Sequence, residues 1–131
     1  MKNKSNKKDL GDFGEALASS YLESQGFLIL ERNFRSPYGE IDIIATDKKT
    51  LVFVEVKLET KSIDRPSVKV NQKKQKRILY TALHYLEGKD WQGNIRFDIL
   101  EINLAYQKKG KYHIQWIPDA FNPESIFPDW I

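Results

Sequence analysis

The sequence predicts a single α/β domain in which a mixed central β-sheet is flanked by helices. Apolar residues recur at helical spacing in two segments, and five other segments are rich in β-branched and alternating apolar residues. Their order along the chain is helix, three strands, helix and two strands, which is typical of α/β and α+β domains. The 131 residues are enough for one domain with a hydrophobic core of its own.

The composition excludes several classes of protein. Hydrophobic residues make up 40% and charged residues 30% of the chain, and 7 Phe, 6 Tyr and 3 Trp need a core in which to pack. The absence of Cys excludes thiol nucleophiles, disulfides and iron–sulfur or cysteine zinc sites. No apolar run is long enough to span a bilayer, and the basic N-terminus lacks the apolar stretch of a signal peptide. We therefore expect a cytoplasmic protein with no membrane partner.

The first predicted element is a helix over residues 9–25. It follows a disordered basic tail over residues 1–8, which carries four lysines and no acid, so the domain itself is expected to span residues 9–131. Gly26 is a stop signal for the helix. The expected core face consists of apolar residues at helical spacing: Leu10, Phe13, Leu17 and Tyr21.

Three strands are predicted next. The first covers residues 27–34 and is followed by a turn at 35–39 that contains Pro and Gly. The second and third cover residues 40–46 and 51–57, and both are rich in β-branched residues. They flank the polar turn 47–50, so these two strands are expected to form a hairpin.

The second half of the chain is predicted to contain a helix and two more strands. A polar loop over residues 59–69 leads into a helix over 70–87, and strands follow at 95–103 and 111–117. The tail over 118–131 is expected to dock on the domain through three aromatic residues: Phe121, Phe127 and Trp130. The turn between the last two strands is expected at 107–110. The expected core face of the helix consists of five residues: Ile78, Leu79, Ala82, Leu83 and Leu86.

The hairpin brings two acidic residues together. Alternation along its second strand places Glu55 and Lys57 on one face, and a symmetric turn places Asp42 directly opposite Glu55. Their Cβ atoms would then be about 4.5–5.5 Å apart, a distance at which like charges are destabilising. A divalent cation would offset this repulsion. Asp42, Glu55 and the backbone carbonyl of Val56 suit Mg²⁺, or Mn²⁺ in its place.

Such a site indicates metal-assisted hydrolysis of a phosphodiester. A bound metal lowers the pKa of a water, and Lys57 would hold the scissile phosphate or that water. The alternative is an ordinary surface hairpin in which Glu40, placed opposite Lys57, is simply its partner; for Glu40 itself we favour that partner role. The charge distribution fits a polyanionic ligand, because residues 57–77 carry eight bases and two acids and follow an acidic segment. Taken alone, this charge pattern favours the alternative of a solvated lysine-rich helix.

At these residues the sequence resembles a known family. The runs GEIDIIA, LVFVEVK and RFDI, with Gly-x-x-Gly-Glu near the start, are similar to the YraN-like family of bacterial proteins, which has a restriction-endonuclease-like fold. A more distant similarity is to archaeal Holliday junction resolvases and to PD-(D/E)XK nucleases. The resemblance implies that Asp42 and Glu55 bind Mg²⁺ and that Lys57 assists the attacking water. It also implies a further active-site acid at Glu15.

Glu15 allows two interpretations. Asp12 and Glu15 have the spacing of a capping box, in which Glu15 would lie three residues after an N-cap. Glu15 also shares a helical stripe with Ala18 and Leu22, which could turn it toward the sheet. The resemblance favours the second interpretation.

Basic residues suggest where a nucleic-acid backbone would lie. Lys74 matches a lysine of the YraN-like pattern Lys-x-x-Arg-Ile, so it is the first candidate on the second helix. Lys73 and Arg77 lie on a stripe with Tyr80 and His84, which would track phosphates or simply face solvent. Two further candidates, Arg35 and Ser36, lie in the loop before the first acidic strand.

The sequence therefore predicts a metal-dependent endonuclease that acts on DNA, with branched or damaged DNA as candidate substrates. One alternative is a catalytically weak or inactive nucleic-acid-binding module. Glu59 supports it, because the family often has Arg at this position. Another is a structural partner in a larger complex that docks through its aromatic tail. Resolvase-like relatives pair to cut two strands, so the resemblance raises the expectation of a homodimer, for which the residues themselves carry no signal.

Overall fold

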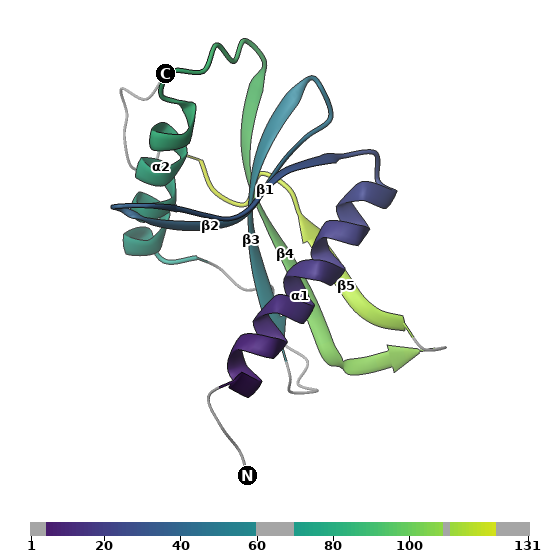
Figure 1. Cartoon of the computed structure of the whole chain (residues 1–131). Helices are drawn as coiled ribbons and strands as arrows, with labels where there is room; N and C mark the ends of the chain where they lie inside the picture. Colours follow the sequence, from purple (N-terminus) through teal and green to yellow (C-terminus); the bar gives the residue numbers. More distant parts are fainter. Residues whose placement is uncertain (1–4, 60–69, 109–110, 123–131) are drawn as a thin grey trace.

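A computed structural model describes residues 5–59, 70–108 and 111–122 (Figure 1). Every predicted helix and strand is present. The elements in chain order are α1 (Ser5–Ser24), β1 (Leu28–Ser36), β2 (Gly39–Thr46), β3 (Thr50–Glu59), α2 (Gln72–Leu86), β4 (Asn94–Lys108) and β5 (Lys111–Ile117).

The strands form one mixed sheet, which confirms the predicted fold class. Its order is β1-β2-β3-β4-β5. Neighbouring strands are antiparallel except for β3 and β4, which are parallel, so the chain must cross over between them. Helix α2 lies in that crossover, and α1 covers the opposite face of the sheet (Figure 1). The architecture is consistent with a restriction-endonuclease-like core.

Alternation along β3 divides the hydrophobic core into two layers. Leu51 and Phe53 pack on the α2 side, whereas Val52 and Val54 pack on the α1 side. This confirms the predicted alternation. Because β-strand side chains alternate, the same rule carries Glu55 to the α2 side of the sheet.

Helix α1 differs from its prediction in two ways. It begins at Ser5, so the second half of the predicted tail is helical, while residues 1–4 lie outside the described part of the chain. The predicted core face is also partly wrong, because Leu10 and Phe13 are 42% and 41% exposed. The fully buried residues are Ala18 and Leu22. A helix turned this way approaches the sheet closely through small residues: a Cβ atom at Gly14 would overlap the side chain of Leu58.

Several other boundaries shift by a few residues. Strand β4 runs to Lys108, beyond the predicted start of the turn. Helix α2 begins one residue after Asn71, whose side chain accepts a hydrogen bond from the Lys74 backbone N–H at 2.9 Å and so acts as N-cap. Leu83, expected in the core, is exposed, and Tyr85 is buried in its place.

The start of the C-terminal segment packs as predicted. Phe121 is buried and its ring stacks on Phe97 with centroids 5.2 Å apart. Phe127 and Trp130, the other aromatic residues expected to dock, lie outside the described residues, as does most of the predicted loop over 59–69.

Candidate functional site

The acidic pair lies where β2 and β3 part. The ladder between these strands keeps the predicted register and ends at the pair Ile43–Val54. The next pair would join Asp42 and Glu55. Instead, the Asp42 carboxylate accepts a hydrogen bond from the Val56 backbone N–H at 2.8 Å. The side chain thus takes the place of a backbone acceptor at the point where the ladder stops.

Strand β2 is irregular at this point. Strict alternation would place Ile41 and Ile43 on one face of β2 and Ile44 on the other. However, Ile41 packs in the same core layer as Ile44, whereas Ile43 packs in the opposite layer. Simple alternation therefore fails next to Asp42. The strand stays paired to β1 through this stretch while leaving β3.

The environment of Asp42 raises its pKa from 3.8 to about 7. Burial of the carboxyl group is the largest cause, because it disfavours the charged form, and the nearby charge of Glu55 is the second. Glu15 and Glu40 add smaller effects in the same direction, and the hydrogen bond from Val56 opposes them. Near neutral pH Asp42 is therefore only partly ionised.

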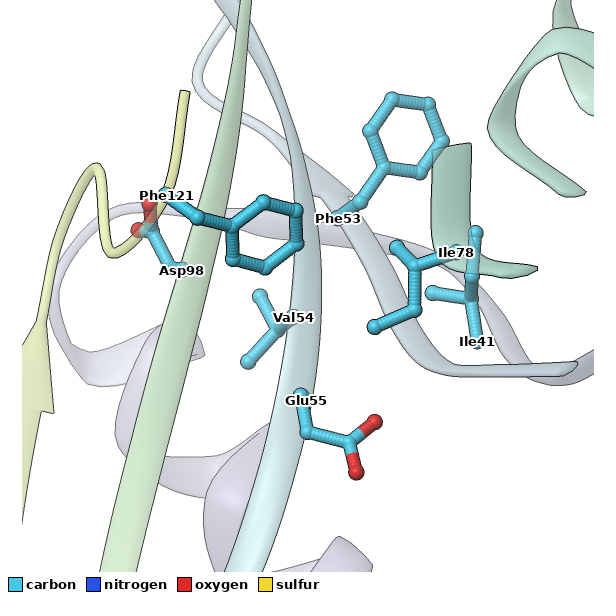
Figure 2. A pocket seen from close by; sticks show the side chains of 7 residues that line it. All are labelled: Ile41, Phe53, Val54, Glu55, Ile78, Asp98 and Phe121. Carbon is cyan, nitrogen blue, oxygen red and sulfur yellow. The ribbon is translucent and has the colours of Figure 1, made fainter. Parts of the chain in front are cut away.

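Glu55 is a buried carboxylate held by two lysines. It is 7% exposed, and its Oε2 lies 2.5 Å from the Lys74 Nζ and 3.6 Å from the Lys57 Nζ. Burial lowers the pKa of Lys74, but the hydrogen bond and charge of Glu55 outweigh it, so this pKa is raised overall. Figure 2 shows the Glu55 carboxylate pointing away from the rings of Phe53 and Phe121. The carboxylate therefore lies next to Lys57 and Lys74 and not among the apolar side chains of the core.

Lys57 and Glu40 do not form the predicted pair. Lys57 contacts Glu55, and Glu40 lies 3.5 Å from Arg35, its direct neighbour in the β1–β2 ladder. Pairing between β2 and β3 begins only at Ile43, so Glu40, at the start of β2, does not lie opposite Lys57. Arg35, proposed as a phosphate contact, is thus an exposed partner of Glu40.

Glu15 faces the sheet and not its own helix end. The helix begins at Ser5, so Asp12 is not an N-cap and the capping-box interpretation is wrong. The Asn33 side chain donates a hydrogen bond to Glu15 at 2.8 Å. Burial raises the pKa of Glu15, while this bond and the charge of Arg32 oppose it. The charge of Glu15 contributes to the raised pKa of Asp42, so the two carboxylates lie in the same region of the protein.

Asn33 is a residue of this site that sequence reasoning missed. Its backbone has a φ of 54°, a left-handed conformation that Asn tolerates better than most residues. An Asn within a strand of apolar and charged residues is the available signal, because strands are depleted in Asn. The conformation aims its amide at Glu15 on the neighbouring helix.

The helix candidates fall into two groups. Lys74 turns inward to Glu55, while Lys73 and Arg77 are exposed. Ser36, expected beside a ligand, is instead used within the protein: its hydroxyl lies 3.0 Å from that of Thr81 on α2 and accepts a hydrogen bond from the Tyr38 N–H.

Asp98 lines the same pocket as Glu55 (Figure 2), but its carboxylate has a structural role. It is 1% exposed and forms an ion pair with Arg96 at 2.9 Å. The Trp116 indole N–H and the Asp119 backbone N–H each donate to it at 2.8 Å. Its oxygens are fully used, which leaves none for a ligand.

The acidic pair could supply two carboxylate ligands to one magnesium ion. Within the described residues, no three carboxylate or imidazole side chains gather closely enough to hold a metal. Mg²⁺ needs only one or two carboxylates because it keeps several waters. Burial of the carboxyl group and, after it, the charge of Glu55 raise the pKa of Asp42, and a divalent cation would offset both effects.

The fold and the acidic pair with its lysines define an α/β protein consistent with a restriction-endonuclease-like core. Residues 14–102 match the model of Uncharacterised protein family UPF0102, and the chain belongs to that family. A UPF0102 protein of Clostridium botulinum strain 657 is 44% identical over 117 residues, or 87% of this chain and 94% of the relative. One of Clostridium perfringens strain 13 is 41% identical over 116 residues, with the same coverage.

The family is the YraN-like family that the sequence motifs indicated. The names of these relatives assign no reaction. Among the described residues, no helix is both long and apolar enough to cross a membrane.

Proposed function

We propose that this protein is a metal-dependent phosphodiester hydrolase that acts on DNA, with branched or damaged DNA as its substrates. The observation that carries the proposal is the acidic pair at the parting of β2 and β3. Asp42 has a pKa of about 7, and the Glu55 beside it is buried with two lysines. Perturbed carboxylates next to cationic side chains are typical of catalytic sites.

Each residue has a defined part in this proposal. Asp42 and Glu55, with the Val56 carbonyl, would hold Mg²⁺ or Mn²⁺. The bound metal supplies a water of lowered pKa and stabilises the negative charge that develops on the phosphate. Lys57, whose side chain is partly exposed, holds the attacking water or the scissile phosphate. Glu15, fixed by Asn33, orients a ligand of the metal.

DNA as the substrate is supported by the charge beside the acidic pair. Lys73 and Arg77 are exposed on α2, next to the inward-facing Lys74. Lysine and arginine side chains bind phosphates without reading sequence. The cations thus suit a backbone that approaches the carboxylates along the helix.

The direct test is cleavage of labelled linear, flap and four-way-junction DNA in Mg²⁺, Mn²⁺ or EDTA. We expect metal-dependent cleavage by the wild type and a loss of at least about 100-fold in Glu55→Gln, because the variant loses one charged ligand. Glu31→Gln, which removes an exposed carboxylate on β1, should cleave like the wild type.

Cleavage that survives in Glu55→Gln would contradict the proposed site. Cleavage that persists in EDTA would contradict the metal. If no substrate is cut while DNA still binds, the hydrolase proposal fails in favour of the second candidate.

The second candidate is a nucleic-acid-binding module without turnover. It is favoured by the contact between Lys74 and Glu55, because the ammonium group already neutralises the carboxylate that a metal would need. Under this proposal the two lysines replace the metal permanently. Titration of the wild type with Mg²⁺ separates the two candidates, since only the hydrolase requires binding.

Replacement of Lys74 by methionine should strengthen metal binding if the hydrolase proposal holds. A charge-assisted hydrogen bond contributes about 1.5–3 kcal/mol, and a metal must displace it. We therefore expect Lys74→Met to raise the affinity for Mg²⁺ about tenfold in calorimetric titration. Lys73→Met removes an exposed neighbouring charge and serves as the control. Equal affinities in Lys74→Met and the wild type would show that Lys74 does not compete with a metal.

A further inference from the structure

Three rings gather on the outer face of α2, away from the hydrophobic core. Tyr38, in the turn between β1 and β2, has its ring centroid 5.5 Å from that of Tyr80 and 6.4 Å from that of His84. The tyrosines remain 53% and 42% exposed although they contact each other. Ring surface is therefore left for a further planar group. We call Tyr38, Tyr80 and His84 the aromatic platform.

The turn that carries Tyr38 is fixed to the helix. The Ser36 hydroxyl accepts from the Tyr38 N–H at 3.0 Å and lies 3.0 Å from the Thr81 hydroxyl. Gly39 has a φ of 154°, and a Cβ atom there would lie 3.4 Å from the Arg77 Cβ. The turn thus lies directly against α2. A ring held in this way loses little conformational freedom when a ligand stacks on it.

Two cationic side chains lie on α2 between the aromatic platform and the N-terminal end of the helix, where Lys74 contacts the acidic pair. Lys73 and Arg77 precede Tyr80 and His84 at intervals of three or four residues, so all four share one side of α2. Both cations are exposed. Lys74, on the same first turn, reaches Glu55. A rise of 1.5 Å per residue separates Lys74 from Tyr80 by about 9 Å along the helix.

We propose that the aromatic platform binds unpaired bases of a single-stranded nucleic acid whose phosphates contact Lys73 and Arg77. Bases stack on aromatic side chains in a sequence-tolerant way, and cationic side chains follow the backbone. The paired bases of a duplex already stack on each other, so only a single strand offers free base faces. The proposal rests on the proposed function, for which it defines the substrate class: DNA in which a single strand adjoins the cleavage site.

The test measures binding in EDTA, so that it does not depend on cleavage. Fluorescence anisotropy would compare a labelled oligo-dT strand, a blunt duplex and the same duplex with an oligo-dT extension. Tyr38→Ser and Tyr80→Ser are each expected to weaken binding of the single strand and of the extended duplex about tenfold, with blunt-duplex binding unchanged. Tyr38→Phe keeps the ring and should bind like the wild type.

Phe13→Ser is the matched control, because it removes an aromatic ring of similar exposure from α1, on the other side of the sheet. Thermal melts and light scattering of every variant would show whether its fold and its oligomeric state are preserved.

Several results would overturn the platform. These are unchanged single-strand affinity in both serine variants, an equal loss on the blunt duplex, or no nucleic-acid binding by the wild type. A change of oligomeric state without a change in binding would instead identify the surface as an interface between copies.

The binding and cleavage results together separate the platform from the hydrolase. If the tyrosines bind the single strand but no substrate is cut, the platform proposal holds and the hydrolase proposal fails. If cutting depends on Glu55 but not on the tyrosines, the reverse holds.

Discussion

Asp42→Asn is expected to stabilise the metal-free protein at pH 8 and to leave its stability nearly unchanged at pH 4. The pKa of Asp42 is about 7 in the folded protein, against an ordinary value of 3.8. Between these values the folded state binds more protons than the unfolded state, so the stability of the wild type falls as pH rises. Each unit of pKa difference corresponds to 1.36 kcal/mol, which gives an effect on the order of 4 kcal/mol at pH 8. Asparagine removes the charge and keeps an oxygen that can accept from Val56.

Urea unfolding in EDTA at pH 4 and pH 8 would measure this difference. Asp47→Asn is a control of opposite sign, because backbone N–H groups of Thr50 and Lys49 bind the Asp47 carboxylate and lower its pKa. That variant should lose stability at both pH values, because the lowered pKa stabilises the wild type at any pH above the ordinary value of 3.8. Mg²⁺ at pH 8 should then stabilise the wild type more than Asp42→Asn, since binding to the folded state alone adds stability. If Asp42→Asn is no more stable than the wild type at pH 8, Asp42 does not carry the unfavourable charge that suggests a metal.

The hairpin register and the strand faces could be predicted because both follow from local rules. A symmetric turn fixes which residues of β2 and β3 pair, and the prediction holds as far as Ile43 and Val54. Alternation in β3 likewise assigned Glu55 to its face. The separation of the strands at Asp42 could not be predicted in this way. It depends on β2 following β1 at this point, which is a property of the whole sheet.

Helix rotation was the second property that the sequence did not determine. In α1 the longest apolar stripe contains Leu10 and Phe13, but the helix turns Leu22 and the small residues Gly14 and Ala18 to the sheet. Small residues allow a close approach, and that advantage appears only when the facing strand is in place. The inward direction of Lys74 has a similar origin. Lys74 borders the buried face of α2. Packing of that face against the core fixes the rotation of the helix about its axis, and this rotation decides whether Lys74 contacts solvent or Glu55.

Asp98→Ala is expected to destabilise the protein by about 3–5 kcal/mol, because several donors around this buried carboxylate would lose their acceptor, at about 1–3 kcal/mol for each buried donor. The guanidinium of Arg96 would lose its bidentate acceptor. The Trp116 indole and the Asp119 backbone would each lose theirs as well. These donors come from β4, β5 and the segment after β5, so the carboxylate joins three parts of the chain at one edge of the core.

Guanidinium or urea unfolding at pH 7 would measure the loss. Asp90→Ala is the matched control, because Asp90 is exposed and accepts a hydrogen bond from the Gln92 side chain. This substitution should change the free energy of unfolding by no more than about 0.5 kcal/mol. The Asp98 carboxylate is held by Arg96, Trp116 and Asp119, so folded Asp98→Ala protein should keep the wild-type affinity for Mg²⁺. A loss of less than about 1 kcal/mol would show that water replaces the missing acceptor. A selective loss of metal affinity in folded protein would instead place Asp98 in the site.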